Sequence, residues 1–192
     1  SYGPLIRSSF LIAATASLAA LLLVLAWSYT ALPKNFTNRW LLGCIFMPFF
    51  VPQISFLLGM QISLSRFGLD GSWLALIWVH MIFILPYTWL IVIPARQALD
   101  SRLDHVAATL GASAWQRFRR IHLPLMAYPL GTALFIGISV SVALYLPTVF
   151  VGAGRINTIT VEAVSLAAGG SRGPAGVAAM LQIAIPVLSF IM

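Results

Sequence analysis

Few side chains in this 192-residue chain could carry chemistry, because only 8% of its residues are charged. Its four acidic residues, Asp70, Asp100, Asp104 and Glu162, all fall in predicted loops. Asp100 and Asp104 share a helical spacing, but capping of a helix start explains them better than acid–base work. The three histidines lack the neighbouring cysteines or carboxylates that a zinc site needs. We therefore expect no cofactor and no metal, and we predict that the chain is not an enzyme.

The sequence also argues against a nucleotide-binding or nucleic-acid-binding role. A phosphate-binding loop requires G-x-x-x-x-G-K-[ST], and the only lysine, Lys34, follows Ala31-Leu32-Pro33. The net charge of +7 would suggest nucleic acid in a soluble protein. In a membrane protein, basic residues in short loops set the orientation instead. No nucleic-acid partner is expected.

Four polar side chains lie within apolar segments and are candidates for lining a solute pathway. His80 is ionisable and falls inside a predicted span, where such residues are often functional. A neutral imidazole can equally bond a neighbouring helix, so both interpretations stay open. Gln53, Gln61 and Gln182 are likewise candidates for either a pathway or bonds between helices.

The elements that position these residues are predicted to be membrane-spanning helices. The mean hydropathy is +0.98, and a soluble domain has about a quarter charged residues. Backbone polar groups in lipid must be satisfied internally, and the alternating pattern of barrel strands is absent. The predicted fold is an all-α membrane protein, a five-span helical bundle. The predicted spans are Ser8–Pro33, Trp40–Ser65, Gly71–Ala95, Leu125–Tyr145 and Gly173–Met192, with a loop over 146–172.

Most of these spans contain proline, which removes a backbone donor and kinks a helix. The bent helices could frame a path or could simply pack in a bundle. These prolines are Pro48, Pro52, Pro86, Pro129 and Pro186. Because the chain starts at Ser1 without Met and ends in an apolar run, we expect residues 1–192 to be one transmembrane domain from a longer protein.

A polar segment over 100–123 interrupts the apolar pattern and is predicted to be a helical hairpin. Ser101 and Asp104 resemble a capping box, and Ser113 and Gln116 resemble a second one. Gly111 falls where a helix end favours positive φ. An apolar face on the first helix must be buried, against lipid headgroups or against a partner. Its residues are Leu103, Val106, Ala107 and Leu110.

The hairpin is predicted to lie in the cytoplasm, because its side of the membrane holds seven basic residues against four on the other. The seven are Lys34, Arg39, Arg96, Arg102, Arg117, Arg119 and Arg120. The four are Arg7, Arg66, Arg155 and Arg172. The N-terminus and the loop 146–172 are then expected outside.

The hairpin resembles the EAA motif of binding-protein-dependent ABC transporter permeases. That motif has Glu-Ala-Ala, then Gly-Ala, a later aromatic, an aliphatic residue and Leu-Pro. The stretches "MPFFVPQISFLLG" and "LPYTWL" are similar to the family's second and third spans. The segment "YLPTVFVGAGRINTITVEAVSLAAGG" is similar to the outer loop of iron-type and thiamine-type permease halves, which are often fused in pairs. The matching hairpin residues are Ala107, Leu110, Gly111, Ala112, Phe118, Ile121, Leu123 and Pro124.

The resemblance implies an ATP-driven importer of the bacterial inner membrane, in which the hairpin is a coupling helix. Its partners would be a cytoplasmic ATP-binding subunit, a second permease domain, an extracytoplasmic solute-binding protein and membrane lipid. Trp115 and Phe118 would supply buried anchor area against the ATP-binding subunit. The family's glutamate is replaced by His105, and Asp104 would supply a neighbouring carboxylate.

Two other functions stay open. An ion-coupled secondary transporter usually places carboxylates near the membrane midplane, and the predicted spans contain no Asp or Glu. A non-transporting scaffold half of a permease is suggested by the loss of the glutamate at position 105. The solute cannot be read from the sequence.

Overall fold

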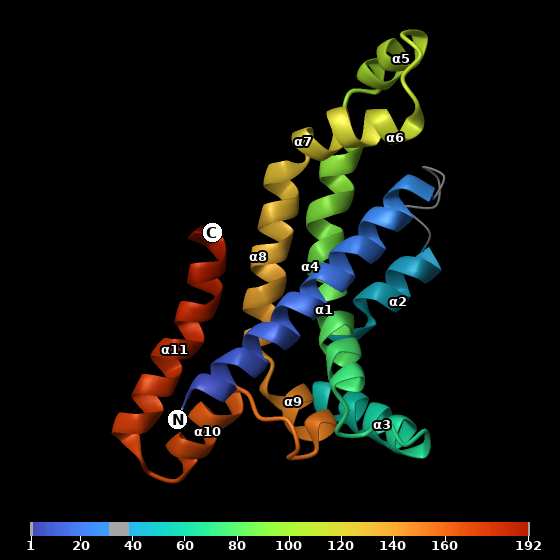
Figure 1. The fold of residues 1–192 in the computed structure, drawn as a ribbon. Helices are drawn as coiled ribbons and strands as arrows, with labels where there is room; N and C mark the ends of the chain where they lie inside the picture. The colour runs from blue at the N-terminus through green and yellow to red at the C-terminus, as the bar shows by residue number, and fades with distance from the viewer. Residues whose placement is uncertain (1, 31–38, 192) are drawn as a thin grey trace.

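The computed structural model describes residues 2–30 and 39–191, and every regular element within these ranges is a helix (Figure 1). The predicted all-α membrane class is therefore confirmed. The end of the first predicted span and the loop that holds Lys34 lie outside the described residues, as do Ser1 and Met192.

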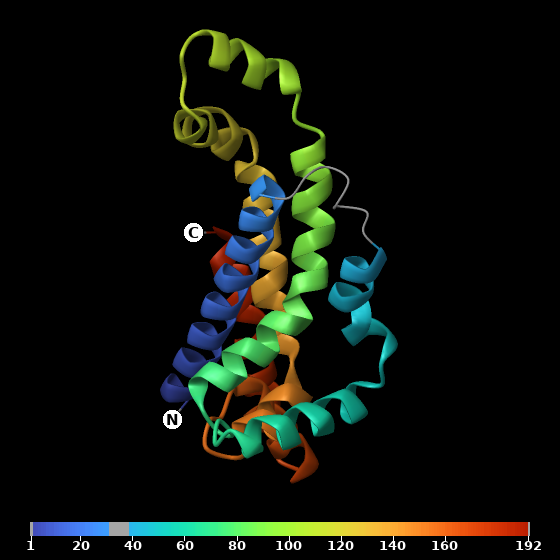
Figure 2. The same cartoon turned by 90° about the vertical axis from the view of Figure 1, so that its right-hand side faces the viewer.

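The centre of the fold is a bundle of α1 (Gly3–Thr30), α4 (Trp73–Gln97) and α8 (Ala127–Ala143), which pack against one another (Figure 2). Small residues let these helices approach closely. Ala16 and Ala20 are fully buried beside α4. A Cβ placed on Gly137 would lie 2.8 Å from the Ser17 side-chain oxygen, so the contact between α8 and α1 requires glycine. Close packing of small residues is a common source of stability between membrane helices.

The second predicted span is broken, which corrects the single helix expected over Trp40–Ser65. The structure has α2 (Arg39–Phe50) and α3 (Gln53–Arg66), which are bent by 108°. Pro52 cannot donate a hydrogen bond to the Pro48 carbonyl, and its ring disfavours helical geometry at Val51. As a result α3 runs across the end of the bundle and contacts α9 (Tyr145–Gly152) instead of continuing α2 (Figure 2).

The segment expected to be a loop over 146–172 is largely helical, which is a second correction. It contains most of α9 and all of α10 (Ile159–Ala168). The preceding span ends earlier than predicted, at Ala143, and Leu144 is extended. Pro147 explains this end, because it has no N–H to bond the Ala143 carbonyl. The helices α9 and α10 cap the end of the bundle that lies away from the hairpin (Figure 1).

Two described helices, α1 and α4, are long and apolar enough to cross a membrane by themselves. The number rises to four if each of two bent pairs is counted as one span. The fifth predicted span corresponds to α11 (Arg172–Ile191), which lies beside α10 and α8. Its apolar stretch, Gly173–Leu188, is shorter than the roughly 20 residues that a full crossing needs. Five complete crossings are therefore not reached among the described residues.

His80 lies in a buried polar cluster between three helices. Its Nδ1 lies 2.8 Å from the Ser141 hydroxyl of α8, and its Nε2 lies 3.3 Å from the Thr148 hydroxyl of α9. Thr148 donates its own proton to the Leu144 carbonyl. The Thr148 hydroxyl can therefore only accept a hydrogen bond from the imidazole, so the ring proton lies on Nε2. The unprotonated Nδ1 then accepts a hydrogen bond from the Ser141 hydroxyl. This geometry favours the interhelical bond over a pathway group.

Replacing His80 with leucine should lower the stability of the bundle while keeping a similar volume. The substitution removes two interhelical hydrogen bonds, each worth about 1 kcal/mol in membrane proteins. We expect the melting temperature of the purified protein to fall by about 4–8 °C. His105→Leu is the matched control, because His105 is exposed on α5. An equal melting temperature for both variants would contradict a structural role for the His80 cluster.

Candidate functional site

The candidate site is the hairpin over 100–123, which the structure places at the end of the bundle remote from the N-terminus (Figure 1). Its first arm is α5 (Ser101–Thr109). The predicted capping box at Ser101 is wrong, because Asp100 is the N-cap and accepts from the Arg102 N–H at 2.9 Å. Aspartate caps a helix as well as serine does, so the helix begins one position earlier than predicted, at Ser101. This leaves the Asp104 carboxylate for another contact.

The turn between the two arms has the conformation expected from its sequence. Gly111 has φ +80°, and its N–H donates to the Ala108 carbonyl at 3.0 Å. The Ala112 N–H donates to the Ala107 carbonyl at 2.9 Å, which completes a Schellman motif. These bonds satisfy carbonyls that would otherwise be left unpaired at the end of α5.

The second arm starts with the predicted Ser113–Gln116 capping box, in which both hydrogen bonds are present. It comprises α6 (Ala114–Arg117), a π-helical turn η2 (Phe118–His122) and α7 (Leu123–Leu125). Pro124 lies in the first turn of α7, where its missing N–H is tolerated. The arm then bends by 68° into α8. Pro129 has no backbone N–H that could donate to the Leu125 carbonyl, and this missing hydrogen bond accounts for the bend.

The apolar face of α5 is exposed rather than buried. Leu110 is 81% exposed and Val106 is 59% exposed, with Leu103 also on the surface. Ala107 and Ala112 are partly buried, and His105 is exposed. No other described part of the chain covers this face. An exposed apolar stripe of this kind marks an interaction surface.

Asp104 holds the two arms of the hairpin together. Its carboxylate oxygen Oδ1 accepts from His122 Nε2 at 2.8 Å and lies 3.7 Å from Arg117 Nε. His122 is buried, and the Asp104 and Arg117 side chains are about one-third exposed. Hydrogen bonds to a charged group are stronger than those between neutral groups. We call Asp104, Arg117 and His122 the hairpin latch.

Tyr29 connects the latch to the membrane bundle. Its ring stacks on His122 with centroids 5.3 Å apart and meets Phe118 edge-on at 5.1 Å. The guanidinium carbon of Arg96, in the last turn of α4, lies 4.6 Å from the Tyr29 ring centroid. Both α1 and α4 are therefore tied to the second arm through one aromatic ring.

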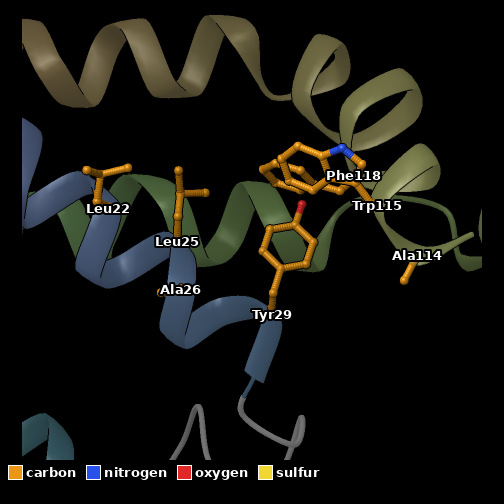
Figure 3. A pocket seen from close by; sticks show the side chains of 7 residues that line it. All are labelled: Leu22, Leu25, Ala26, Tyr29, Ala114, Trp115 and Phe118. Carbon is orange, nitrogen blue, oxygen red and sulfur yellow. The ribbon is translucent and has the colours of Figure 1, made fainter.

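An apolar groove lies between the C-terminal end of α1 and the second arm (Figure 3). Its volume is about 500 Å³. Trp115 stacks on Phe118 at 5.5 Å and forms one wall, and Tyr29 points toward these two rings from α1 (Figure 3). Trp115 is 66% exposed, so it anchors no buried contact within this chain. The lining residues are Leu22, Leu25, Ala26, Tyr29, Ala114, Trp115 and Phe118.

The remaining predicted residues are dispersed over the fold. Ile121 is partly buried in η2, and Leu123 and Pro124 are exposed at the start of α7. Gln53 and Gln61 are partly buried on α3, and Gln182 is partly buried on α11. The contacts of α3 are with α9 and α2, whereas those of α11 are with α10, α8 and α1. A pathway lined by all three glutamines stays a prediction.

The described residues bring together no group of three or more histidine, cysteine, aspartate or glutamate side chains that could hold a metal ion. The site instead offers an exposed apolar face on α5 and a latch of Asp104, Arg117 and His122 that joins the two arms.

A family profile described as "Binding-protein-dependent transport system inner membrane component" matches residues 23–192. The chain belongs to this family. The match includes the hairpin, the latch and the groove-lining residues from Leu25 onward. The family is one of transport components, in agreement with the predicted transport role.

Named relatives are also permeases. The chain is 37% identical over 175 residues to the inner membrane ABC transporter permease protein YnjC of Escherichia coli, covering 91% of this chain and 33% of that protein. It is 28% identical to a putative 2-aminoethylphosphonate transport system permease protein, PhnV, of Salmonella paratyphi A, covering 79% of this chain and 58% of that protein. It is 30% identical to the molybdate/tungstate transport system permease protein WtpB of Thermococcus kodakarensis, covering 65% of this chain and 50% of that protein. The chain thus spans about a third to three fifths of these relatives.

Sequence reasoning missed three residues of this permease-family site: Tyr29, Arg96 and His122. Arg96 was predicted only as an orientation charge, and Tyr29 and His122 were given no role in the site. Tyr29 of α1 contacts the hairpin and Arg96 of α4 contacts Tyr29, and periodicity within one helix does not reveal such contacts between helices. The one signal available was a histidine at the end of a basic helix, four residues after Phe118 and so on the same face.

Asp104→Asn should loosen the hairpin, because it removes the charge shared by His122 and Arg117. We expect amide hydrogen exchange in α5 to accelerate about fivefold, which corresponds to roughly 1 kcal/mol of lost local stability. Asp100→Asn is the matched control, since it makes the same charge change at a position where asparagine still caps the helix. The latch is not stabilising if the two variants exchange at the same rate.

Proposed function

We propose that this chain is a transmembrane permease domain of an ATP-driven importer, and that its hairpin transmits motion from a separate ATP-binding subunit. The observation that carries this proposal is the exposed apolar face of α5, with Leu110 81% exposed, at one end of a membrane bundle. Family membership and permease relatives support the same conclusion. The proposed site is the hairpin 100–123, within one permease domain over 1–192.

The contacts of the hairpin suit a lever. The Schellman turn and the capping box fix the angle between its arms, and the latch ties the arms together. The first arm follows α4 after only three intervening residues, 98–100, and the second arm leads into α8 through Met126. A displacement of α5 would therefore move α4 and α8 together, and Tyr29 would carry it to α1. Relative tilting of these helices would open the solute path to one side of the membrane and close it to the other.

In the assembled importer we place the hairpin in the cytoplasm and the N-terminal end of α1 outside, in a bacterial inner membrane. This orientation rests on the excess of basic residues on the hairpin side. The exposed apolar surfaces of α2 and α11 would face lipid and a second permease domain. A solute-binding protein would dock at the opposite end, near α9 and α10. The solute is left unassigned, because PhnV and WtpB are named for different ones.

The other two functions have less support. An ion-coupled transporter needs a free ionisable group in the bundle, whereas both His80 ring nitrogens have hydroxyl partners. A scaffold half would not need a rigid hairpin with an uncovered apolar face. His105 is exposed, so it can contact the partner in place of the family's glutamate, with a side chain of different polarity.

Leu110→Asp should abolish capture of the ATP-binding subunit. The substitution introduces a charge into the apolar face that the proposal buries at the interface, and loss of one buried anchor costs about 2 kcal/mol or more. Co-purification with the tagged ATP-binding subunit measures the effect. Phe67→Asp is the matched control, because Phe67 is 79% exposed but lies in the turn before α4, at the opposite end. Normal capture by Leu110→Asp would refute the proposed docking face.

Gly111→Ala should weaken the coupling of ATP hydrolysis to transport. A Cβ at this position meets nothing within 4 Å, so the effect comes from the positive φ alone. The left-handed conformation costs an alanine about 1 kcal/mol, and asparagine tolerates it better. We expect solute-stimulated ATPase activity to fall for alanine more than for asparagine. Gly59→Ala, within α3 and also free of contacts, should leave the activity unchanged. Equal activities for the alanine and asparagine variants would contradict the turn's role.

A further inference from the structure

The cluster around Tyr29 carries one positive charge more than its carboxylates neutralise. Arg96 and Arg117 supply two guanidinium charges, while Asp104 supplies one carboxylate, and Arg117 already pairs with it. All four acidic residues of the chain are in the described ranges, and none pairs with Arg96. The Arg96 Nε atom is buried and has no hydrogen-bond partner in that part of the chain. The Tyr29 ring is its neighbour, but an aromatic face does not neutralise a charge.

An apolar groove adjoins this unneutralised cation. Tyr29 lines the groove, and the Arg96 guanidinium carbon lies 4.6 Å from the centroid of the same ring, so the cation is separated from the groove by one aromatic side chain. The other lining side chains are aliphatic or aromatic, and Leu22 and Trp115 are 57% and 66% exposed, so the groove opens to the surroundings. It occupies the last two turns of α1, a helix that is long and apolar enough to span the membrane.

A cation next to the Tyr29 ring and an apolar groove at the end of a membrane span match one kind of molecule. We propose that the groove between α1 and α6 binds an anionic phospholipid, with an acyl chain along Leu22, Leu25 and Trp115 and the phosphate near Arg96. The lipid phosphate supplies the negative charge that the cluster lacks. The acyl chain covers apolar side chains that the protein leaves exposed.

The surrounding charges favour an anionic headgroup. Arg119 and Arg120 follow Phe118 in η2 and are exposed, and neither has a carboxylate partner in the described chain. Basic side chains at a membrane surface attract anionic lipid. Asp104 is the acidic group in the cluster, and its charge is already shared by His122 and Arg117. A zwitterionic lipid would fill the groove equally well but would leave Arg96 without a net counter-charge.

Quenching of Trp115 fluorescence by brominated lipid tests this site directly. The full-length permease is reconstituted in phosphatidylcholine vesicles that contain a small fraction of brominated phosphatidylglycerol or brominated phosphatidylcholine. The chain has six tryptophans, so the signal of Trp115 is the difference between the wild type and Trp115→Phe. We expect half-maximal quenching at about fivefold less brominated phosphatidylglycerol than brominated phosphatidylcholine.

Four variants separate the effect of the charge from that of the groove. Arg96→Gln should remove the preference for phosphatidylglycerol, whereas Arg96→Lys should retain most of it. Arg102→Gln is the matched control, because it makes the same charge change on the exposed start of α5 and should keep the full preference. Ala114→Phe fills the groove and should reduce Trp115 quenching by both lipids.

Equal quenching of Trp115 by the two lipids in the wild type would overturn the proposal, whatever the variants do. Absence of quenching with the ATP-binding subunit bound, together with a crosslink from Trp115 to that subunit, would also overturn it by showing that protein fills the groove. The measurement uses neither ATP nor solute, so a failure of the proposed transport function leaves its outcome unaffected.

Discussion

Proline has no backbone N–H, and this missing donor accounts for three of the breaks between helices in this protein. Pro52, Pro129 and Pro147 each leave the carbonyl four residues earlier without its helical partner. The chain bends by 108° before Pro52 and by 68° before Pro129, and it ends α8 four residues before Pro147. The first turn sends α3 across the bundle, the second sets the angle of the hairpin, and the third brings α9 under α4. The polar contacts of His80 with Ser141 and Thr148 depend on this last turn.

The hairpin is held by a second set of interactions that are local in space but not in sequence. Asp104 joins the arms through His122 and Arg117, and Tyr29 joins the second arm to α1 and α4. Each contact is modest, since the ion pairs are partly exposed. Together they link the hairpin to α1 and, through Tyr29, to α4. The proposed lever needs such links, because an arm attached only by its backbone could hinge without moving the bundle.

The prominent surfaces of the hairpin have different chemistry and so suit different neighbours. The face of α5 is apolar with few nearby charges, which fits a protein groove. The groove beside α6 is apolar, and an unneutralised arginine contacts Tyr29 in its wall, which fits an amphiphile. Their separation on the two arms means that a protein and a lipid could contact the hairpin at the same time, and the latch residues lie between them.

The sequence by itself determined the membrane class, the helical hairpin with its glycine turn and second capping box, and the family resemblance that the profile match confirms. These features depend on composition, on short-range spacing and on the backbone preferences of single residues, all of which are local. Only the tertiary structure decided that the second span is broken, that residues 145–152 and 159–168 are helical, and that Asp104 binds His122 instead of capping α5. The tertiary structure alone showed that Tyr29 contacts the hairpin and that Arg96 contacts Tyr29. Contacts between helices depend on how whole helices pack, and the pattern of residues along one helix does not show which other helix each of its faces will contact.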